Sequence, residues 1–140
     1  SMQENFAALA AEEMKSDVSL SIENRPIRAH KVAGDVVWFD FVNICEGPRS
    51  QNDYIELAML FTTVLISNVP VLDTTREDAA RRFISLVDEF YDRRVKLILS
   101  ADEGIANLYQ GQRLSFEFQR TQSRLLEMQS ESYLGEPHIS

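Results

Sequence analysis

The stretch TVLISNVPVL, residues 63–72, decides the fold class of this chain. Its first five residues, TVLIS, are apolar on both faces of an extended chain, which indicates a strand buried on both sides. Pro70 is expected to end this strand, because proline has no backbone N–H to donate to a neighbouring strand. The segment VKLILS, residues 95–100, predicts a second strand of the same kind.

A long amphipathic helix is expected between these two strands, from about residue 75 to 92. Its apolar residues recur at helical spacing and form one wide stripe: Ala80, Phe83, Ile84, Val87, Phe90 and Tyr91. On the outer face, the spacing of Glu77 to Arg81, and of Asp78 to Arg82, favours i,i+4 ion pairs. A strand, a helix and a second strand, with both strands apolar throughout, predict a parallel sheet covered on both faces.

The first part of the chain predicts antiparallel structure instead. After a helix at residues 3–15, the segments VSLSI (18–22) and IRAHK (27–31) alternate around the turn ENRP (23–26), which indicates a hairpin. A third strand, VVWFDF (36–41), follows. The predicted fold class is therefore α/β, with a mixed, mainly parallel sheet, an N-terminal antiparallel hairpin and flanking helices.

The other segments carry weaker signals. Ser50 lies three residues before Asp53, a spacing typical of a capping box, and predicts the start of a helix over about 52–61. The last third of the chain is interpreted as an unassigned segment at 105–115, a short strand SFEF at 115–118 and an amphipathic helix at 119–134.

The length of 140 residues suits one domain with a single core. Ser1-Met2 looks like the remnant of a cleaved tag, so residues 3–140 are expected to be one domain taken from a larger protein. With 22 acidic against 14 basic residues, the net charge of −8 argues against a surface for nucleic acid or anionic membrane. No apolar run reaches the ~20 residues of a membrane span. The single cysteine, Cys45, cannot form an internal disulfide, and a cytoplasmic protein is expected.

Ser67 and Asn68 stand at the end of the TVLIS strand, where many nucleotide-hydrolysing proteins have two acidic residues. Those acids bind magnesium and orient the attacking water, and an asparagine amide cannot replace a carboxylate in either role. The phosphate-binding motif G-x-x-x-x-G-K-S/T does not occur in the sequence. The chain thus has the outline of a P-loop NTPase without the P-loop, and we predict that it is inactive alone and binds no cofactor or metal. The alternative is that TVLIS is only a buried strand.

Arg120 and Arg124 lie four residues apart on one face of the predicted terminal helix. Ser123-Arg124 followed by an apolar residue is how many AAA-type proteins place an arginine finger, which stabilises charge on a transferring phosphoryl group. Guanidinium suits this role because it stays charged and binds phosphate through two hydrogen bonds. Arg124 and Arg120 are therefore candidates for a finger or sensor, and Ser123 is a candidate interface residue. The alternative is that both arginines pair with nearby acids such as Glu117 and Glu127.

A second polar group follows the predicted third strand, where α/β proteins place ligand sites. The candidates for binding or for an interface are Arg49, Ser50, Asp53 and Tyr54. The alternative is structural, since capping of the following helix already explains Ser50 and Asp53. His30 and His138 are far apart in sequence, so no Ser-His-Asp triad and no metal site is predicted.

Four ordered segments resemble the C-terminal part of the ZapE family, which comprises AAA-type ATPases of bacterial cell division and mitochondrial relatives. The segments are WFDFVNICEGPRSQNDY (38–54), VLISNVPVL (64–72), DAARRFISLVDEFYDRRVKLILSA (78–101) and FEFQRTQSRLLEMQSESYL (116–134). The resemblance covers about residues 18–134. It implies an upstream ATPase core in the same chain that binds ATP and Mg²⁺, and a link to cell-division proteins such as FtsZ. It also implies a location in the cytoplasm, at the division site or at the periphery of the inner membrane.

The resemblance favours a C-terminal accessory or regulatory domain of a ZapE-like ATP-hydrolysing protein. In that interpretation, the polar clusters at 49–54 and 120–127 face the ATPase core or a neighbouring subunit. One alternative is a self-contained protein-interaction module that recruits a partner. A third interpretation is a small-molecule enzyme that uses Asp53 and Tyr54, but the sequence offers no convergent base, nucleophile or metal ligands for it.

Overall fold

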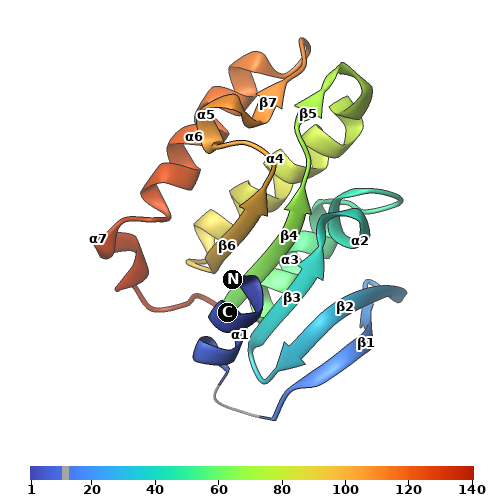
Figure 1. Ribbon diagram of the computed structural model, residues 1–140, viewed down its shortest axis with the longest axis vertical. Helices are drawn as coiled ribbons and strands as arrows, with labels where there is room; N and C mark the ends of the chain where they lie inside the picture. Colours follow the sequence, from blue (N-terminus) through green and yellow to red (C-terminus); the bar gives the residue numbers. More distant parts are fainter. Residues whose placement is uncertain (11–12) are drawn as a thin grey trace.

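A five-stranded mixed sheet, in the order β1-β2-β3-β4-β6, forms the centre of the molecule (Figure 1). The computed structural model describes residues 1–10 and 13–140. The strands are β1 (Lys15–Ile22), β2 (Arg25–Ala33), β3 (Val36–Asp40), β4 (Thr63–Val69) and β6 (Lys96–Ala101). The pairs β1–β2 and β2–β3 are antiparallel, whereas β3–β4 and β4–β6 are parallel. The predicted α/β class, with its N-terminal hairpin and mixed sheet, is confirmed.

Helices cover both faces of this sheet. They are α1 (Met2–Leu9), α2 (Phe41–Cys45), α3 (Gln51–Leu60), the 3₁₀ turn η1 (Thr74–Arg76), α4 (Glu77–Asp92), α5 (Ile105–Leu108), α6 (Ser115–Glu127) and α7 (Glu131–Leu134). A small second sheet pairs β5 (Leu72–Asp73) with β7 (Tyr109–Gln110) in parallel. Three of the five strand pairings among the described residues are therefore parallel.

The TVLIS stretch forms the central strand β4, as predicted. Val64 and Ile66 point into the larger core, which α2, α3, α4 and α6 help to close, and Leu65 belongs to a smaller core on the other face. There α1 covers the sheet, and the Phe6 ring packs against Trp38 with 6.1 Å between ring centroids. In Figure 1, α1 lies in front of the sheet and α3 and α4 lie behind it. Burial on both faces explains why β4 contains so few polar residues.

The hairpin turn differs from the prediction. Glu23 and Asn24 alone connect β1 to β2, and both have positive φ, at 52° and 60°. Two consecutive residues with positive φ give a turn whose twist matches that of the flanking strands. Arg25 and Pro26 therefore belong to β2 rather than to the turn. At the N-terminus, the predicted helix 3–15 is also too long: α1 ends at Leu9, residues 11–12 lie outside the described residues, and β1 already begins at Lys15.

The predicted strand SFEF, residues 115–118, is wrong, because these residues form the first turn of α6. Phe118 is buried and stacks with Phe83 of α4, whereas Phe116 is 83% exposed. In a strand, residues two apart lie on the same face, so the alternation F-E-F resembles a strand with one apolar face. In a helix, residues two apart lie on nearly opposite sides, which agrees with one buried and one exposed phenylalanine. The predicted terminal helix is divided: α6 ends at Glu127, and α7 begins after Ser130, whose hydroxyl accepts a hydrogen bond from the Tyr133 N–H.

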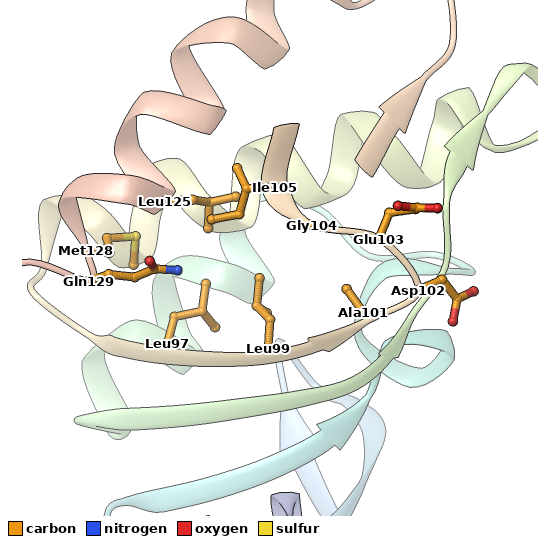
Figure 2. A pocket seen from close by; sticks show the side chains of 10 residues that line it. All are labelled: Leu97, Leu99, Ala101, Asp102, Glu103, Gly104, Ile105, Leu125, Met128 and Gln129. Atoms are coloured by element: carbon orange, nitrogen blue, oxygen red, sulfur yellow. The ribbon is translucent and has the colours of Figure 1, made fainter. Parts of the chain in front are cut away.

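The last strand of the sheet, β6, has an open outer edge, with no strand paired to it among residues 1–10 and 13–140. Leu97 and Leu99 point toward Leu125 and Met128 at the end of α6 (Figure 2). Two adjoining hollows of about 420 and 590 Å³ follow this edge, and both are lined by Leu97, Leu99 and Met128. We call them together the β6 groove. In the described part of the chain, no helix has the length and apolar character needed to cross a membrane.

The segment that includes and follows α7 folds back over the ends of α3 and α4. The buried Tyr133 hydroxyl donates to the Val95 carbonyl oxygen at 2.6 Å and lies 3.2 Å from that of Phe90. Further along, the His138 Nε2 lies 2.6 Å from the Ala58 carbonyl oxygen. These contacts hold the C-terminal residues against the turn between α4 and β6.

Candidate functional site

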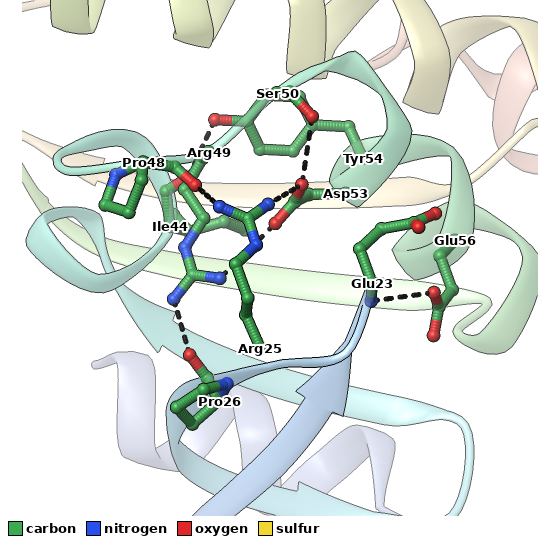
Figure 3. A network of polar contacts seen from close by, with 10 residues as sticks. All are labelled: Glu23, Arg25, Pro26, Ile44, Pro48, Arg49, Ser50, Asp53, Tyr54 and Glu56. Carbon is green, nitrogen blue, oxygen red and sulfur yellow. Dashed lines mark hydrogen bonds and ion pairs between the residues drawn. The ribbon is translucent and has the colours of Figure 1, made fainter.

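The predicted candidates at residues 49–54 converge on one buried carboxylate (Figure 3). Asp53 is fully buried, and its oxygens accept from Arg25 Nη2 at 2.5 Å, from Arg49 Nη1 at 3.3 Å and from the Ser50 hydroxyl at 3.0 Å. Arg25 also donates to the Pro48 carbonyl. A buried carboxylate between two guanidinium groups is electrically compensated, so this cluster has the character of an internal connection.

This network ties the hairpin to the start of α3. Arg49 Nη2 donates to the Pro26 carbonyl at 2.8 Å, so each arginine bridges from one element to the other. Ser50 does occupy the N-cap position of α3, but its side chain makes no capping hydrogen bond and donates to Asp53 instead. The predicted capping box is therefore wrong. The sequence interpretation also missed Arg25, because it assigned this residue to the turn.

Tyr54 and Cys45 are buried side by side beneath the same loop. The Tyr54 hydroxyl donates to the Ile44 carbonyl at 2.8 Å. Burial raises the pKa of the Cys45 thiol and of the Tyr54 phenol far above their ordinary values. Both groups are therefore neutral at physiological pH, and neither has the ionised or solvent-accessible form of a nucleophile or base. This geometry gives no support to the small-molecule enzyme.

Arg49, Ser50 and Tyr54 also line a pocket of about 320 Å³ between α3 and α4, where Arg81 and Arg82 face them. The predicted pairs Glu77–Arg81 and Asp78–Arg82 do not occur among the ion pairs of the described residues. The Glu77 carboxylate instead accepts from the Tyr109 hydroxyl and from the backbone N–H groups of residues 112 and 113. Those hydrogen bonds lower the pKa of Glu77.

The candidate finger residues Arg120 and Arg124 both pair with Asp88 of α4. Arg124 Nη1 lies 2.5 Å from Asp88 Oδ1, and Arg120 Nη2 lies 3.2 Å from Oδ2. The Arg124 guanidinium also covers the Tyr91 ring, 4.9 Å from its centroid. The suggested alternative partners Glu117 and Glu127 do not pair with either arginine in the described chain. The structure thus provides a different acid from the one expected, and the finger role stays a prediction.

Ser67 and Asn68 lie at the carboxyl end of the parallel strands, at the edge of a pocket of about 400 Å³. The Ser67 hydroxyl accepts from Trp38 Nε1 at 3.0 Å, and Asn68 Nδ2 donates to Asp40 Oδ2 at 2.6 Å. The other Asp40 oxygen accepts from the Val42 N–H and caps α2. No group of three or more potential metal ligands occurs in the described residues. Ser67 and Asn68 are therefore each hydrogen-bonded to a side chain of β3.

Comparisons with known proteins give one consistent family. The sequence model of the AFG1-like ATPases matches residues 1–137. The chain is 46% identical, over 139 residues, to the cell division protein ZapE of Escherichia coli (strain K12), an alignment that covers 99% of this chain and 37% of that protein. It is 34% identical, over 146 residues, to the lactation elevated protein 1 homolog B of Danio rerio, which covers 81% of this chain and 29% of that protein. The chain therefore spans 37% of the length of the Escherichia coli relative and 29% of that of the Danio rerio relative. No solved structure matches significantly.

Proposed function

Since the chain belongs to the AFG1-like ATPase family, we propose that it is an accessory region of a ZapE-like, ATP-hydrolysing protein linked to cell division. The observation that carries this proposal is the 46% identity to a cell division protein over almost the whole chain. The sequence itself contains no phosphate-binding G-x-x-x-x-G-K-S/T motif. ATP and Mg²⁺ belong, in this proposal, to an ATPase core elsewhere in the parent protein, and the chain acts on that core by docking to it.

The β6 groove is the surface we propose for this docking. Its edge strand has no partner strand among the described residues and lies beside half-buried leucines, a combination that pairs readily with another strand. The groove rim includes Leu9 and Leu134, both partly exposed. Covering these side chains removes apolar surface from water, at roughly 25 cal/mol per Å². The proposed occupant is a strand or helix of the ATPase core.

A pair of matched variants tests this docking in the full-length protein. Leu134→Glu places a charge at the groove rim, where the side chain is 42% exposed, and Met59→Glu places one on α3 outside the groove, where the side chain is 48% exposed. We expect Leu134→Glu to lower ATP turnover at least severalfold and Met59→Glu to leave it unchanged. Both variants of the 140-residue chain should melt near the wild-type temperature. Equal turnover in the two variants would contradict the docking surface.

The proposal includes a phosphoryl-contacting role for Arg124, with Arg120 as the second candidate. For this role Asp88 must release the Arg124 guanidinium when the core binds nucleotide. An arginine finger increases turnover about 10³- to 10⁵-fold. In the full-length protein, Arg124→Ala is therefore expected to lower ATP turnover about 10³-fold or more. Asp88→Asn frees the guanidinium and is expected to keep turnover. If both variants lower ATP turnover by the same modest factor, the role of Arg124 is only to hold α6 against α4.

A second candidate function, a self-contained protein-interaction module, is favoured by one observation. Phe116 is 83% exposed on α6 and lines a surface hollow with Arg120 and Ser123. An exposed aromatic ring beside an arginine is typical of an interaction hot spot. Binding of purified FtsZ to the isolated 140-residue chain, and its loss in Phe116→Ala, would favour the module. Absence of binding by the isolated chain would favour the accessory region.

A further inference from the structure

The pocket between α3 and α4 has a local charge opposite to that of the whole chain. It is lined by Arg49, Ser50, Gln51, Tyr54, Asp78, Arg81, Arg82 and Ser85. Three of these eight residues are arginines and one is an acid, although the chain has 22 acidic and 14 basic residues. An excess of positive charge in a concave site attracts anions.

Two of the three arginines have guanidinium groups that are free to bind. Neither Arg81 nor Arg82 forms an ion pair with any described residue. Arg82 makes a single hydrogen bond, from Nη1 to the Cys45 carbonyl at 3.3 Å, and no hydrogen bond from the Arg81 side chain occurs in the described part of the chain. Because a guanidinium group has five N–H donors, most of the donors of this pair have no acceptor among the described residues.

Arg49 forms a fixed wall of the same pocket. Its side chain is 10% exposed and is held by Asp53 and by the Pro26 carbonyl. Its Nε is buried and has no hydrogen-bond partner in residues 1–10 and 13–140. A buried donor without an acceptor is costly, and the two hydrogen bonds to Asp53 and Pro26 hold the Arg49 side chain in place despite this cost.

The start of α3 adds backbone donors. Ser50 and Gln51, which line the pocket, are the N-cap and first residue of this ten-residue helix. Ser50 donates to Asp53 and leaves the helix without a side-chain cap; the Asp53 N–H donates to the Ser50 carbonyl at 3.0 Å, whereas the N–H groups of Gln51 and Asn52 have no partner among the described residues. The N-terminus of a helix carries a partial positive charge and accepts anions.

The acids near the pocket only partly offset this charge. Asp78 lines it, but forms no ion pair with either neighbouring arginine in the described residues. Asp53 is already compensated by Arg25 and Arg49. Glu89 accepts from Gln51 Nε2 at 2.8 Å, at the side of the pocket. Because Arg49 shares the compensation of Asp53, the unpaired charges of the lining in the described residues are the positive charges of Arg81 and Arg82 and the negative charge of Asp78.

We propose that this pocket binds a phosphate-bearing anion, with Arg81 and Arg82 as its charged ligands and the first turn of α3 as a backbone cradle. Guanidinium groups bind phosphate oxygens bidentately, and Arg49 supplies the rigid wall. Two sources share this chemistry: free inorganic phosphate or pyrophosphate, and the phosphate chain of a nucleotide. The site goes beyond the accessory role proposed above, because it resides entirely in this chain.

The experiment titrates the 140-residue chain with phosphate, pyrophosphate and ATP, without Mg²⁺ and at constant ionic strength. Isothermal titration calorimetry gives affinity and stoichiometry, and thermal unfolding gives the stabilisation that a ligand of the folded state produces. We expect saturable binding of one anion per chain. Equal affinity for pyrophosphate and ATP identifies the phosphate groups as the whole ligand, whereas tighter binding of ATP identifies a nucleotide.

Three variants complete the test. Arg81→Gln and Arg82→Gln are each expected to weaken binding about ten- to hundredfold, the loss typical of one charged hydrogen-bonding group. Asp78→Asn is expected to tighten it severalfold, because it removes the opposing charge. Arg113→Gln, at an exposed arginine outside the pocket, is the control and should bind as wild type. Absence of saturable binding, or equal binding by Arg81→Gln and Arg113→Gln, would overturn the proposal.

Discussion

Replacing Asp53 with asparagine removes the negative charge at the centre of the network that joins the hairpin to α3. Asparagine keeps the shape of the side chain, but it cannot balance two guanidinium groups. The Asp53 side chain is fully buried and the Arg49 side chain is 10% exposed, whereas that of Arg25 is 37% exposed. The variant therefore leaves Arg49 as a buried cation without a counter-ion, while Arg25 can turn toward solvent.

The magnitude follows from this difference in burial. Removing one partner of a buried ion pair costs about 3–5 kcal/mol. Because Arg25 can regain water, we expect the lower end of this range, a loss of about 3 kcal/mol in the free energy of unfolding. A domain of this size is stable by only about 5–15 kcal/mol, so Asp53→Asn still folds but is clearly weakened. Adding Arg49→Met removes the uncompensated charge, and the double variant should recover part of the loss.

Urea unfolding of the 140-residue chain measures these losses. The fluorescence of Trp38, the only tryptophan in the sequence, reports the transition. Glu56→Gln is the control, because in the described residues Glu56 contacts the hairpin through a single exposed hydrogen bond, which it accepts from the Glu23 N–H. The control should lose less than about 1 kcal/mol. A similarly small loss for Asp53→Asn, or a double variant no more stable than the single one, would refute the reasoning.

Three further predictions concern stability and use the same unfolding assay. Tyr133→Phe leaves the buried Val95 carbonyl without its donor and should cost about 1–3 kcal/mol; an unchanged unfolding midpoint would contradict this. Asn68→Ala, at φ 60°, loses the bond to Asp40 and adds left-handed strain, so it should be less stable than Asn68→Gly by about 1–2 kcal/mol, and the reverse order would count against it. The pKa of Glu77 is lowered in the folded chain below its usual 4.5, so its contribution is present above about pH 4.5 and lost as the pH falls through the folded pKa. Glu77→Gln should therefore flatten the loss of stability in acid, and an unchanged pH profile would disprove the role of this carboxylate.

The sequence predicts β4 and α4 because burial alone determines their patterns. β4 is covered on both faces, so its middle residues are all apolar, and α4 is covered on one face, so its apolar residues recur at helical spacing. β6 has an equally apolar sequence, yet its leucines are only half-buried. The apolar pattern of VKLILS therefore predicts deeper burial of these leucines than the described residues give them. Such a difference is expected if the β6 edge is the docking surface proposed above.

Site chemistry was less predictable, because its contacts join residues far apart in sequence. Asp53 and Arg25 are 28 residues apart, and Asp88 and Arg124 are 36 residues apart. Local spacing rules favoured partners within one helical turn, such as Glu127 for Arg124. Recognition of positive φ at Asn24 would have moved Arg25 into a strand, but no local signal reveals which carboxylate lies opposite.

The contacts of Tyr133 also set an order of events during synthesis. The chain leaves the ribosome from the N-terminus, and domains fold as their residues emerge. The Phe90 carbonyl precedes Tyr133 by 43 residues, and the Ala58 carbonyl precedes His138 by 80. The turn between α4 and β6 therefore lacks its contacts with Tyr133 and the residues after it until α7 has been translated. During that interval the Val95 carbonyl has no donor from Tyr133, and the β6 groove lacks Leu134, one of the residues that line it in the folded chain.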